Sequence, residues 1–218
     1  MSRALSLCGL ILAAGESSRM RADKALLPWP PVTPGQIAEG TFLSAAIRSL
    51  LPFTDMVLVV AGENEQNLAP IVYANGADLV RNPDPSRGQF SSLRVGLQEI
   101  LNRGRDGAMF TLVDRPPVSA DTISLLHDRF ETAVLRWKWA VVPEYRGKHG
   151  HPIVLGRELL EAFLRAPADS NAREVQHTHH DHIEYVPIDD PLIAMNVNTP
   201  EEYAALQQTM RSPQAADF

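Results

Sequence analysis

The sequence predicts one α/β domain: a single doubly wound, mainly parallel sheet with helices on both faces. Short apolar runs of strand length alternate with helical patterns of apolar residues along most of the chain. The runs are apolar almost throughout, as expected for strands covered on both faces. No internal repeat or linker divides the 218 residues. We therefore expect a single domain over residues 1–210 and a polar tail over residues 211–218.

Local signals place the elements of the first half. The sequence predicts strands over residues 5–12, 56–61 and 77–80, and helices over residues 41–51, 64–73 and 89–101. Pro52 ends the first of these helices, because proline cannot continue the hydrogen-bond ladder. The pair Asn75 and Gly76 forms a turn signal after the second helix. In the third helix, Leu93 and Leu97 lie on one apolar face.

The second half continues the alternation of elements. We expect strands over residues 108–113, 139–142, 183–188 and 193–197, and helices over residues 119–130, 158–164 and from 200 onward. Ser119 is a favoured N-cap residue, and Pro200 suits the first position of a helix. Residues 28–40 and the chain after Met210 contain mostly turn-forming and polar residues, so we expect loops there.

The expected sheet also predicts where a ligand binds. In an open parallel sheet, ligands bind beyond the carboxyl ends of the strands. We therefore expect the chemistry of this protein in the loops that follow Leu12, Val80 and Val113.

Composition and charge exclude several classes of protein. The chain carries 20 lysines and arginines against 26 acidic residues, a net charge of -6, which argues against a nonspecific nucleic-acid binder. A single cysteine, Cys8, excludes an intrachain disulfide, and we interpret it as a small core residue. No apolar run approaches the ~20 residues that span a bilayer, so we expect no membrane partner.

The stretch LCGLILAAGESSRMRADK, residues 7–24, has two interpretations. A secretory signal peptide needs a basic start and a long apolar segment, but Arg3 is the only early charge and Ser6 interrupts a short run. The alternative is a buried strand that runs into a ligand-binding loop. We favour this second interpretation and expect a cytoplasmic protein.

The loop after this first strand has features of an anion-binding site. Ala13, Ala14 and Gly15 let the backbone approach a ligand closely, and their N–H groups can form a nest for an anion. Arg19 and Lys24 add two cations. The spacing matches neither the P-loop nor the dinucleotide-binding pattern. Taken alone, the pattern describes a turn with two solvated basic residues.

The motif does not stand alone. LAAGESSRMRADKALLP resembles the opening signature of the nucleotidyltransferase superfamily, LAAGxSxRMGxxKxLLP, and most closely that of molybdenum-cofactor cytidylyl- and guanylyltransferases. Further stretches match the family in the same order: RNPDPSRGQFSSLRVGL (81–97), LVDRPPVS (112–119), GHPIVL (150–155), DSNAR (169–173) and NVNTPEEY (196–203). The resemblance covers roughly residues 5–206 and implies a Rossmann-like nucleotidyltransferase fold.

The resemblance also implies an activity. A nucleoside monophosphate would pass from a nucleoside triphosphate to the terminal phosphate of the molybdopterin cofactor, with Mg²⁺ bound and pyrophosphate released. The attacking phosphate is already an anion near neutral pH, so positioning and charge stabilisation suffice. Implied protein partners are molybdoenzyme apoproteins or cofactor chaperones. Two alternatives remain: another phosphate acceptor, such as a sugar or alditol phosphate, or a non-catalytic cofactor-binding or delivery protein on this fold.

The family motifs imply roles for individual residues of this chain. Lys24, Arg19 and Asp114 would be catalytic. The nucleotide would contact Leu12, Ala13, Ala14, Gly15, Lys24, Asn82, Ser91, Ser92 and Asp114. Asp114 and Asn198 would hold the metal, since Mg²⁺ prefers oxygen ligands. His151 and Arg173 would contact the acceptor.

Several of these residues also have a purely structural interpretation. Asp114 suits the N-cap of the following helix, and Asn198 suits a turn. Ser91 and Ser92 would satisfy free N–H groups in the first turn of their helix. Arg115 would either contact phosphate or face solvent.

The nucleotide itself is less clear from the sequence. The stretch AAG favours CTP, whereas NVNTPEE favours the guanylyl branch; we expect CTP rather than GTP. Arg21, Val113, Arg115 and Asn198 depart from the commonest family pattern, which keeps the delivery-protein alternative open. The histidine-rich run over residues 177–182 suggests zinc, but it lacks cysteine partners, and we favour a surface turn.

Overall fold

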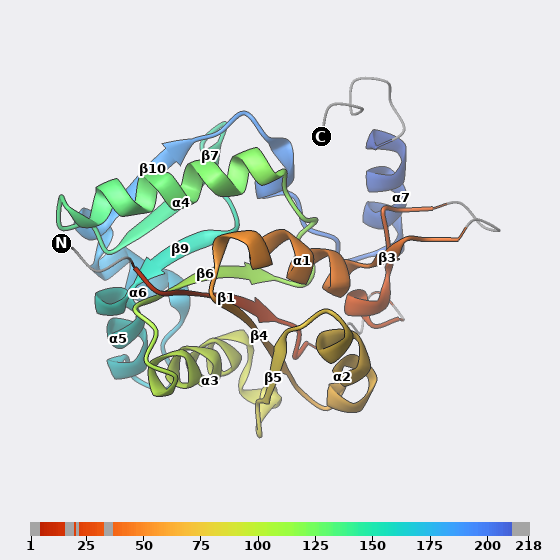
Figure 1. The fold of residues 1–218 in the computed structure, drawn as a ribbon, viewed down its shortest axis with the longest axis horizontal. Helices are drawn as coiled ribbons and strands as arrows, with labels where there is room; N and C mark the ends of the chain where they lie inside the picture. The colour runs from red at the N-terminus through yellow and green to blue at the C-terminus, as the bar shows by residue number, and fades with distance from the viewer. Residues whose placement is uncertain (1–4, 16–19, 21, 33–36, 211–218) are drawn as a thin grey trace.

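The structure, a computed structural model, describes residues 5–15, 20, 22–32 and 37–210. Its main sheet has the strand order β10-β7-β9-β6-β1-β4-β5, with β8 paired to β7 (Figure 1). The strands are β1 (Leu7–Leu12), β4 (Met56–Ala61), β5 (Asp78–Arg81), β6 (Gly107–Leu112), β7 (Ala140–Tyr145), β8 (Lys148–His149), β9 (Ile153–Gly156) and β10 (Ile183–Pro187).

Most neighbouring strands are parallel. β5, β4, β1 and β6 form one parallel block, and β10 runs parallel to β7. Only β9, between β6 and β7, and the short β8 pair in antiparallel register among the described strands of this sheet. The predicted fold class, a mainly parallel α/β sheet, is therefore confirmed.

Helices cover both faces of this sheet. The α-helices are α1 (Phe42–Leu50), α2 (Glu65–Ala74), α3 (Gln89–Asn102), α4 (Ala120–Val134), α5 (Arg157–Arg165), α6 (Ala172–Thr178) and α7 (Pro200–Thr209). Short 3₁₀-helices are η1 (Lys24–Leu26), η2 (Leu51–Phe53), η3 (Pro85–Arg87), η4 (His180–His182) and η5 (Pro191–Ala194). One hydrophobic cluster joins α1, α2 and α4 to the sheet, and a second joins α3 and α5 to the opposite face.

The first strand shows why the apolar runs are continuous. All six residues of β1 are buried, and successive side chains enter opposite clusters: Leu10 packs with α3, whereas Ile11 packs with α1. Each such fully buried side chain contributes roughly 1.5–3 kcal/mol to stability. Cys8 is fully buried in the same strand, and burial raises its pKa to about 12. The prediction of a core cysteine is confirmed.

Two local predictions were wrong, and two elements were missed. Residues 193–197 do not form a strand: Pro191 starts η5, and Asp190 caps it by accepting a hydrogen bond from Leu192 N. Residues 28–40 do not form a loop throughout, because β2 (Pro28–Trp29) pairs with β3 (Gly40–Thr41). Strand β9 and helix α6 were not predicted as elements. Within the described ranges, no helix combines the length and apolar character needed to cross a membrane.

Candidate active site

A cleft of about 410 Å³ opens where β1 and β6 end. This is the position expected of a ligand in an open parallel sheet. Residues predicted to contact nucleotide line the cleft: Leu12, Ala14, Gly15, Lys24, Ser92 and Asp114. The other lining residues lie within the motif stretches 81–97 and 112–119 but were not predicted to contact nucleotide: Pro85, Ser86, Gly88, Gln89, Leu112 and Val113. The cleft therefore joins the first loop, the start of α3 and the end of β6.

The first loop begins as an extension of the sheet. Ala13 N donates to Val60 O at 2.8 Å, and Ala13 is buried rather than facing the cleft. Ala14 and Gly15 follow and line the cleft. Gly62, at the end of β4, packs directly behind them: a Cβ at this position would lie 2.9 Å from Ala14 O. The close approach requires glycine at position 62, a requirement that the sequence alone did not reveal.

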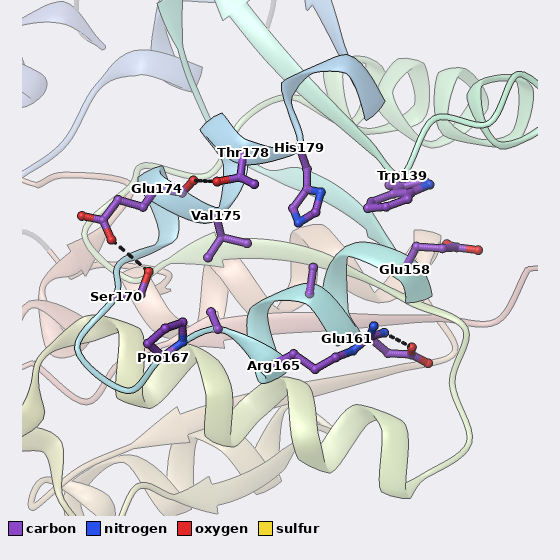
Figure 2. A pocket seen from close by; sticks show the side chains of 12 residues that line it. Trp139, Glu158, Glu161, Arg165, Pro167, Ser170, Glu174, Val175, Thr178 and His179 are labelled. Carbon is purple, nitrogen blue, oxygen red and sulfur yellow. Dashed lines mark hydrogen bonds and ion pairs between the residues drawn. The ribbon is translucent and has the colours of Figure 1, made fainter.

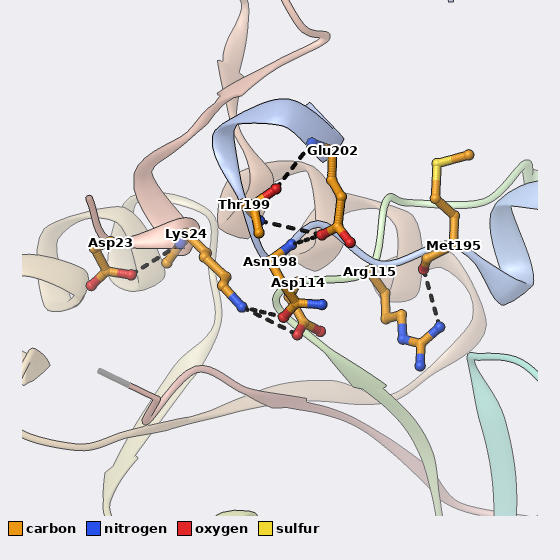
Figure 3. A network of polar contacts seen from close by, with 9 residues as sticks. Asp23, Lys24, Asp114, Arg115, Met195, Asn198, Thr199 and Glu202 are labelled. Atoms are coloured by element: carbon orange, nitrogen blue, oxygen red, sulfur yellow. Dashed lines mark hydrogen bonds and ion pairs between the residues drawn. The ribbon is translucent and has the colours of Figure 1, made fainter. Parts of the chain in front are cut away.

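Three residues from distant parts of the chain converge at the mouth of this cleft. Lys24, on η1, directs its Nζ to Asn198 Oδ1 at 2.7 Å and to Asp114 Oδ2 at 3.5 Å. Figure 3 shows the three side chains meeting from η1, the end of β6 and the segment before α7. The sequence predicted roles for all three, and the fold brings them together across 174 residues of chain.

The oxygen atoms in this group suit a divalent cation. Asp114 Oδ1 is buried and has no hydrogen-bond partner among the described residues. A buried carboxylate oxygen without a partner is costly, so its presence indicates a ligand position. Asn198 offers a neutral amide oxygen beside the same ammonium group. Carboxylate and amide oxygens are ligands that Mg²⁺ accepts.

Asp114 is not the cap of the helix that follows. Ser119 caps α4, and its side chain accepts a hydrogen bond from Thr122 N at 3.2 Å. The structural interpretation of Asp114 as an N-cap is therefore wrong, and the predicted cap at Ser119 is confirmed. Likewise, Thr199 caps α7, which leaves the Asn198 side chain directed to Lys24.

Arg115 neither contacts the cleft nor faces solvent fully. It is half-buried, and its Nη1 donates to Met195 O at 3.1 Å. Figure 3 shows this Arg115 contact, and beside it Val197 N donates to Asp114 O at 2.8 Å. Two hydrogen bonds therefore hold the segment before α7 against the end of β6. Burial lowers the pKa of Arg115, and Asp114 partly opposes this shift. The unusual arginine therefore fixes the segment that carries Asn198.

Asn82 holds the start of α3 in place. It is buried, and its Nδ2 donates to Ser91 Oγ and Ser92 Oγ, both at 2.9 Å. Its Oδ1 accepts from Asp84 N at 3.0 Å. These bonds fix the entry to α3, where Gly88 has a φ of 86° and lines the cleft. The amino end of this helix favours an anion in the cleft. Direct nucleotide contacts by Asn82 and Ser91 remain predictions.

His151 lies apart from the cleft. Its ring sits edge-to-face on Phe110 at 5.3 Å and lines an internal cavity of about 10 Å³ that Arg115 shares. Burial, and to a smaller degree the charge of Arg115, lowers the pKa of His151 to about 3. The imidazole is therefore neutral at physiological pH and offers no positive charge to an acceptor phosphate.

A second residue predicted to contact the acceptor is not brought to the cleft. Arg173 is exposed on α6, where it forms no hydrogen bond or ion pair with any other described residue. Arg19 lies outside the described residues. The roles of both remain predictions.

The histidine-rich run forms ring contacts rather than one convergent group. His182 stacks on Trp139 at 4.0 Å, and His179 lies against the same indole at 5.1 Å. His180 pairs instead with His177. Over the described part of the chain, the His, Asp and Glu side chains that converge closely enough to hold a metal are His127, Asp128 and Glu131 on α4.

A larger cavity of about 710 Å³ lies between α5 and α6 (Figure 2). Its charged side chains are largely engaged with neighbours: Arg165 pairs with Glu161, and Glu174 caps α6. It contains no group of side chains from distant segments comparable to that of the smaller cleft. Convergent polar groups, rather than volume, indicate a reaction site, so we place the chemistry in the smaller cleft.

Comparison with known proteins shows the family to which the chain belongs. Residues 9–183 match the family described as "MobA-like NTP transferase domain". The chain is 26% identical over 201 residues to the molybdenum cofactor cytidylyltransferase of Escherichia coli K12, covering 91% of this chain and 94% of that protein. It is 34% identical over 122 residues to a probable molybdenum cofactor guanylyltransferase of Rhodopirellula baltica, covering 56% and 54%.

The fold is also similar to solved structures. The crystal structure of Rv0371c from Mycobacterium tuberculosis H37Rv superposes with a TM-score of 0.76 at 23% identity, covering 93% of this chain and 98% of that one. A manganese complex of Rv0371c gives a TM-score of 0.73 at 22% identity, covering 94% and 99%. The matched family model spans β1 to the start of β10 and thus all strands that build the cleft. The chain is a nucleotidyltransferase and belongs to the family of MobA-like NTP transferase domains.

Proposed function

We propose that this nucleotidyltransferase moves CMP from CTP to the terminal phosphate of molybdopterin, with Mg²⁺ as the metal. The observation that carries the proposal is the convergence of Lys24, Asp114 and Asn198 beside the Ala14–Gly15 loop. A cation, two cation-binding oxygens and a small-residue loop are what transfer between phosphates requires.

The reaction needs one bond to form and one to break. An oxygen of the acceptor phosphate attacks the α-phosphorus of the nucleotide, and the bond from this phosphorus to the oxygen bridging toward the β-phosphorus breaks. Pyrophosphate leaves with the electron pair. Lys24 neutralises charge on the triphosphate and the departing group, while the amino end of α3 supports the anion from the other side of the cleft.

The metal would be held by Asp114 and Asn198. When bound, Mg²⁺ supplies positive charge to the phosphate oxygens. Both residues are positioned for this role by the contacts around Arg115, which fix the segment before α7 to the end of β6. The manganese complex of Rv0371c, a protein of the same fold, is consistent with a divalent ion.

The choice of CTP rests on two observations. The E. coli cytidylyltransferase matches nearly the whole chain, whereas the R. baltica guanylyltransferase matches about half. Ala14, which carries a methyl group into the cleft, stands where some GTP-using relatives have glycine. One methyl group gives modest discrimination, so the expected preference is about tenfold or a little more.

Thermal unfolding with Mg²⁺ and each of CTP, GTP, UTP and ATP tests the nucleotide. A ligand at a hundred times its Kd stabilises the native state by about 2.7 kcal/mol, so we expect the largest rise in Tm with CTP. Pyrophosphate release on adding molybdopterin then tests the acceptor. A larger rise with GTP would contradict the CTP assignment, and binding without pyrophosphate release would favour a delivery protein.

One observation keeps a second acceptor in view. Neither His151 nor Arg173 reaches the cleft, so no cationic pair specific for a pterin phosphate accompanies Lys24 among the described residues. A sugar or alditol phosphate would then serve as acceptor with the same nucleotide chemistry. Pyrophosphate release with such a phosphate, and none with molybdopterin, would support this alternative.

A further inference from the structure

We propose that Asn64 is a positioning residue that sets Lys24 relative to the phosphate-binding loop. The inference rests on the nucleotide chemistry proposed for the cleft. Asn64 does not line that cleft, and no family motif in the sequence includes it. Its side chain nevertheless joins the ends of β1 and β4 to the short helix that carries Lys24.

The first evidence for this role is that the Asn64 side chain does not cap its own helix. Asn64 is the N-cap residue of α2, a position where asparagine normally bonds to the first turn of its helix. Here the side chain makes no such bond. Because an N-cap bond normally stabilises the helix, a side chain turned away from it needs other contacts in its place.

Those other contacts use the whole carboxamide group. Asn64 Oδ1 accepts from Gly62 N at 3.1 Å, and Nδ2 donates to Ala13 O at 2.9 Å. The same Nδ2 donates to Asp23 Oδ2 at 2.8 Å. Both nitrogen hydrogens and the oxygen are therefore used, and the half-buried group links three separate segments.

The contact with Asp23 extends this link to Lys24. Asp23 is the N-cap residue of η1, and its Oδ1 accepts from Ala25 N at 3.0 Å. Lys24 lies between the two residues of that cap. A continuous chain of hydrogen bonds thus runs from the Ala13 carbonyl through Asn64 and Asp23 to the backbone on which Lys24 is mounted.

The same turn also supports the loop on its other side. Gly62 packs so closely on Ala14 that it has no space for a side chain. The turn from Gly62 to Asn64 therefore contacts two successive loop residues, one by packing and one by hydrogen bonding. This arrangement fixes the loop and the lysine in a single frame, which is what phosphate transfer by positioning requires.

Asparagine is the residue type that the arrangement needs. Asn64→Asp keeps the shape, but it replaces both donors with oxygen and places a second carboxylate beside Asp23. Asn67→Asp is the matched control, because it adds the same charge one turn further along α2, where Asn67 is exposed. Both variants add one negative charge near the start of α2, but only Asn64→Asp breaks the hydrogen-bond chain and places the charge beside Asp23.

Hydrogen exchange reads out the position of η1 directly. We expect Asn64→Asp to speed amide exchange in peptides covering residues 22–27 at least tenfold, and Asn67→Asp to leave it within twofold. In turnover, Asn64→Asp should lower kcat/KM for the nucleotide about tenfold without changing the KM of the acceptor. A merely structural role would lower Tm while leaving both kinetic constants of the folded enzyme unchanged.

A double variant that exchanges residues 23 and 64, the swapped pair, tests the hydrogen bond between them. Asp23→Asn combined with Asn64→Asp restores one amide-to-carboxylate hydrogen bond and retains an oxygen for Ala25 N. The double variant should therefore recover much of the exchange protection and of kcat/KM that either single variant loses.

The outcomes separate the two proposals. Unchanged exchange in Asn64→Asp, equal damage from Asn67→Asp, or no recovery in the swapped pair would overturn the positioning role while wild-type turnover stands. A wild-type protein that binds no nucleotide and releases no pyrophosphate would overturn the proposed function, and the positioning role with it.

Discussion

The cleft at the ends of β1 and β6 differs from the larger cavity between α5 and α6, called the groove below, in where its side chains come from. The groove is the larger of the two, but its charged groups come from two neighbouring helices and bond locally: Arg165 pairs with Glu161, and Glu174 accepts from Asn171 N. The cleft is smaller, yet the side chains that meet there are separated by up to 174 residues, and Asp114 Oδ1 has no hydrogen-bond partner among the described residues. Long-range convergence with an unsatisfied polar atom therefore distinguishes a site for chemistry from a gap between helices.

The largest expected effect comes from Asp114. Asp114→Asn removes the negative charge while keeping the shape, so Mg²⁺-dependent turnover should fall about a thousandfold. Asp121→Asn, at the exposed start of α4, provides the matched control and should retain full turnover. Steady-state pyrophosphate release measures both. Activity within tenfold of wild type in Asp114→Asn would show that Asp114 does not hold the metal.

A smaller loss is expected at Lys24. Lys24→Met removes the ammonium group that would neutralise the phosphates in the proposed reaction, and loss of one such contact costs about 3 kcal/mol, or roughly a hundredfold in kcat/KM. The Kd of the triphosphate, measured by calorimetry, should rise, whereas that of the unphosphorylated nucleoside should not. Lys148→Met, on an exposed strand, is the control. Equal weakening of nucleoside and triphosphate would contradict the phosphate role.

The buried imidazole of His151 should appear in the pH dependence of stability. The pKa of His151 is lowered to about 3 in the folded protein, against about 6.5 when unfolded, so the unfolded state binds more protons between these values. The free energy of unfolding should therefore fall as pH drops from 6.5 toward 3, by up to about 1.4 kcal/mol per pH unit.

Urea titrations of wild type and His151→Gln at several pH values isolate this contribution. The variant lacks the titrating ring and should show the shallower decline. The exposed His180→Gln provides the matched control for losing one imidazole. Identical slopes in wild type and His151→Gln would mean that the ring is not held neutral by its surroundings.

The smallest effect is expected in the groove. Ala162→Trp places an indole in the 710 Å³ cavity, and Glu158→Lys reverses a charge on its exposed rim. Both variants should keep turnover within twofold of wild type, because neither touches the cleft. A tenfold loss in both, with Tm unchanged, would show that the groove takes part in the reaction and would remove the distinction drawn between the two regions.

The sequence predicted the centre of the fold better than its edges. β1, β4 and β6 are mostly apolar runs of strand length, as expected for strands that are buried on both faces. The segment before α7 was assigned wrongly because its apolar residues resemble a strand, whereas Pro191 and the Asp190 cap start a 3₁₀-helix. Strand β9 is too short, at four residues, for its period to be read.

The site residues also differ in whether the sequence could predict them. Lys24, Asp114 and Asn198 could be predicted because each lies in a recognisable motif, and the fold then brings them together. Gly62 and Asn64 could not, because their partners at Ala13, Ala14 and Asp23 lie far away in the chain. Arg115 was singled out, but its actual partner, a backbone carbonyl at Met195, carries no signal in the sequence.

Strand β9 runs against its neighbours in the middle of the sheet, so the connections along the rim of the cleft are of two kinds. β9 is antiparallel to β6, with Ile153 opposite Phe110, so the chain enters β9 at the edge where β1 and β6 leave the sheet. On the side of β5, β4, β1 and β6, the chain leaves each strand at this rim and continues to a separate helix. Beyond β6 the rim also contains an entrance, that of β9, which is tied back through β8 to the end of β7. A change in the length of that hairpin would therefore reshape one side of the rim while leaving the other in place.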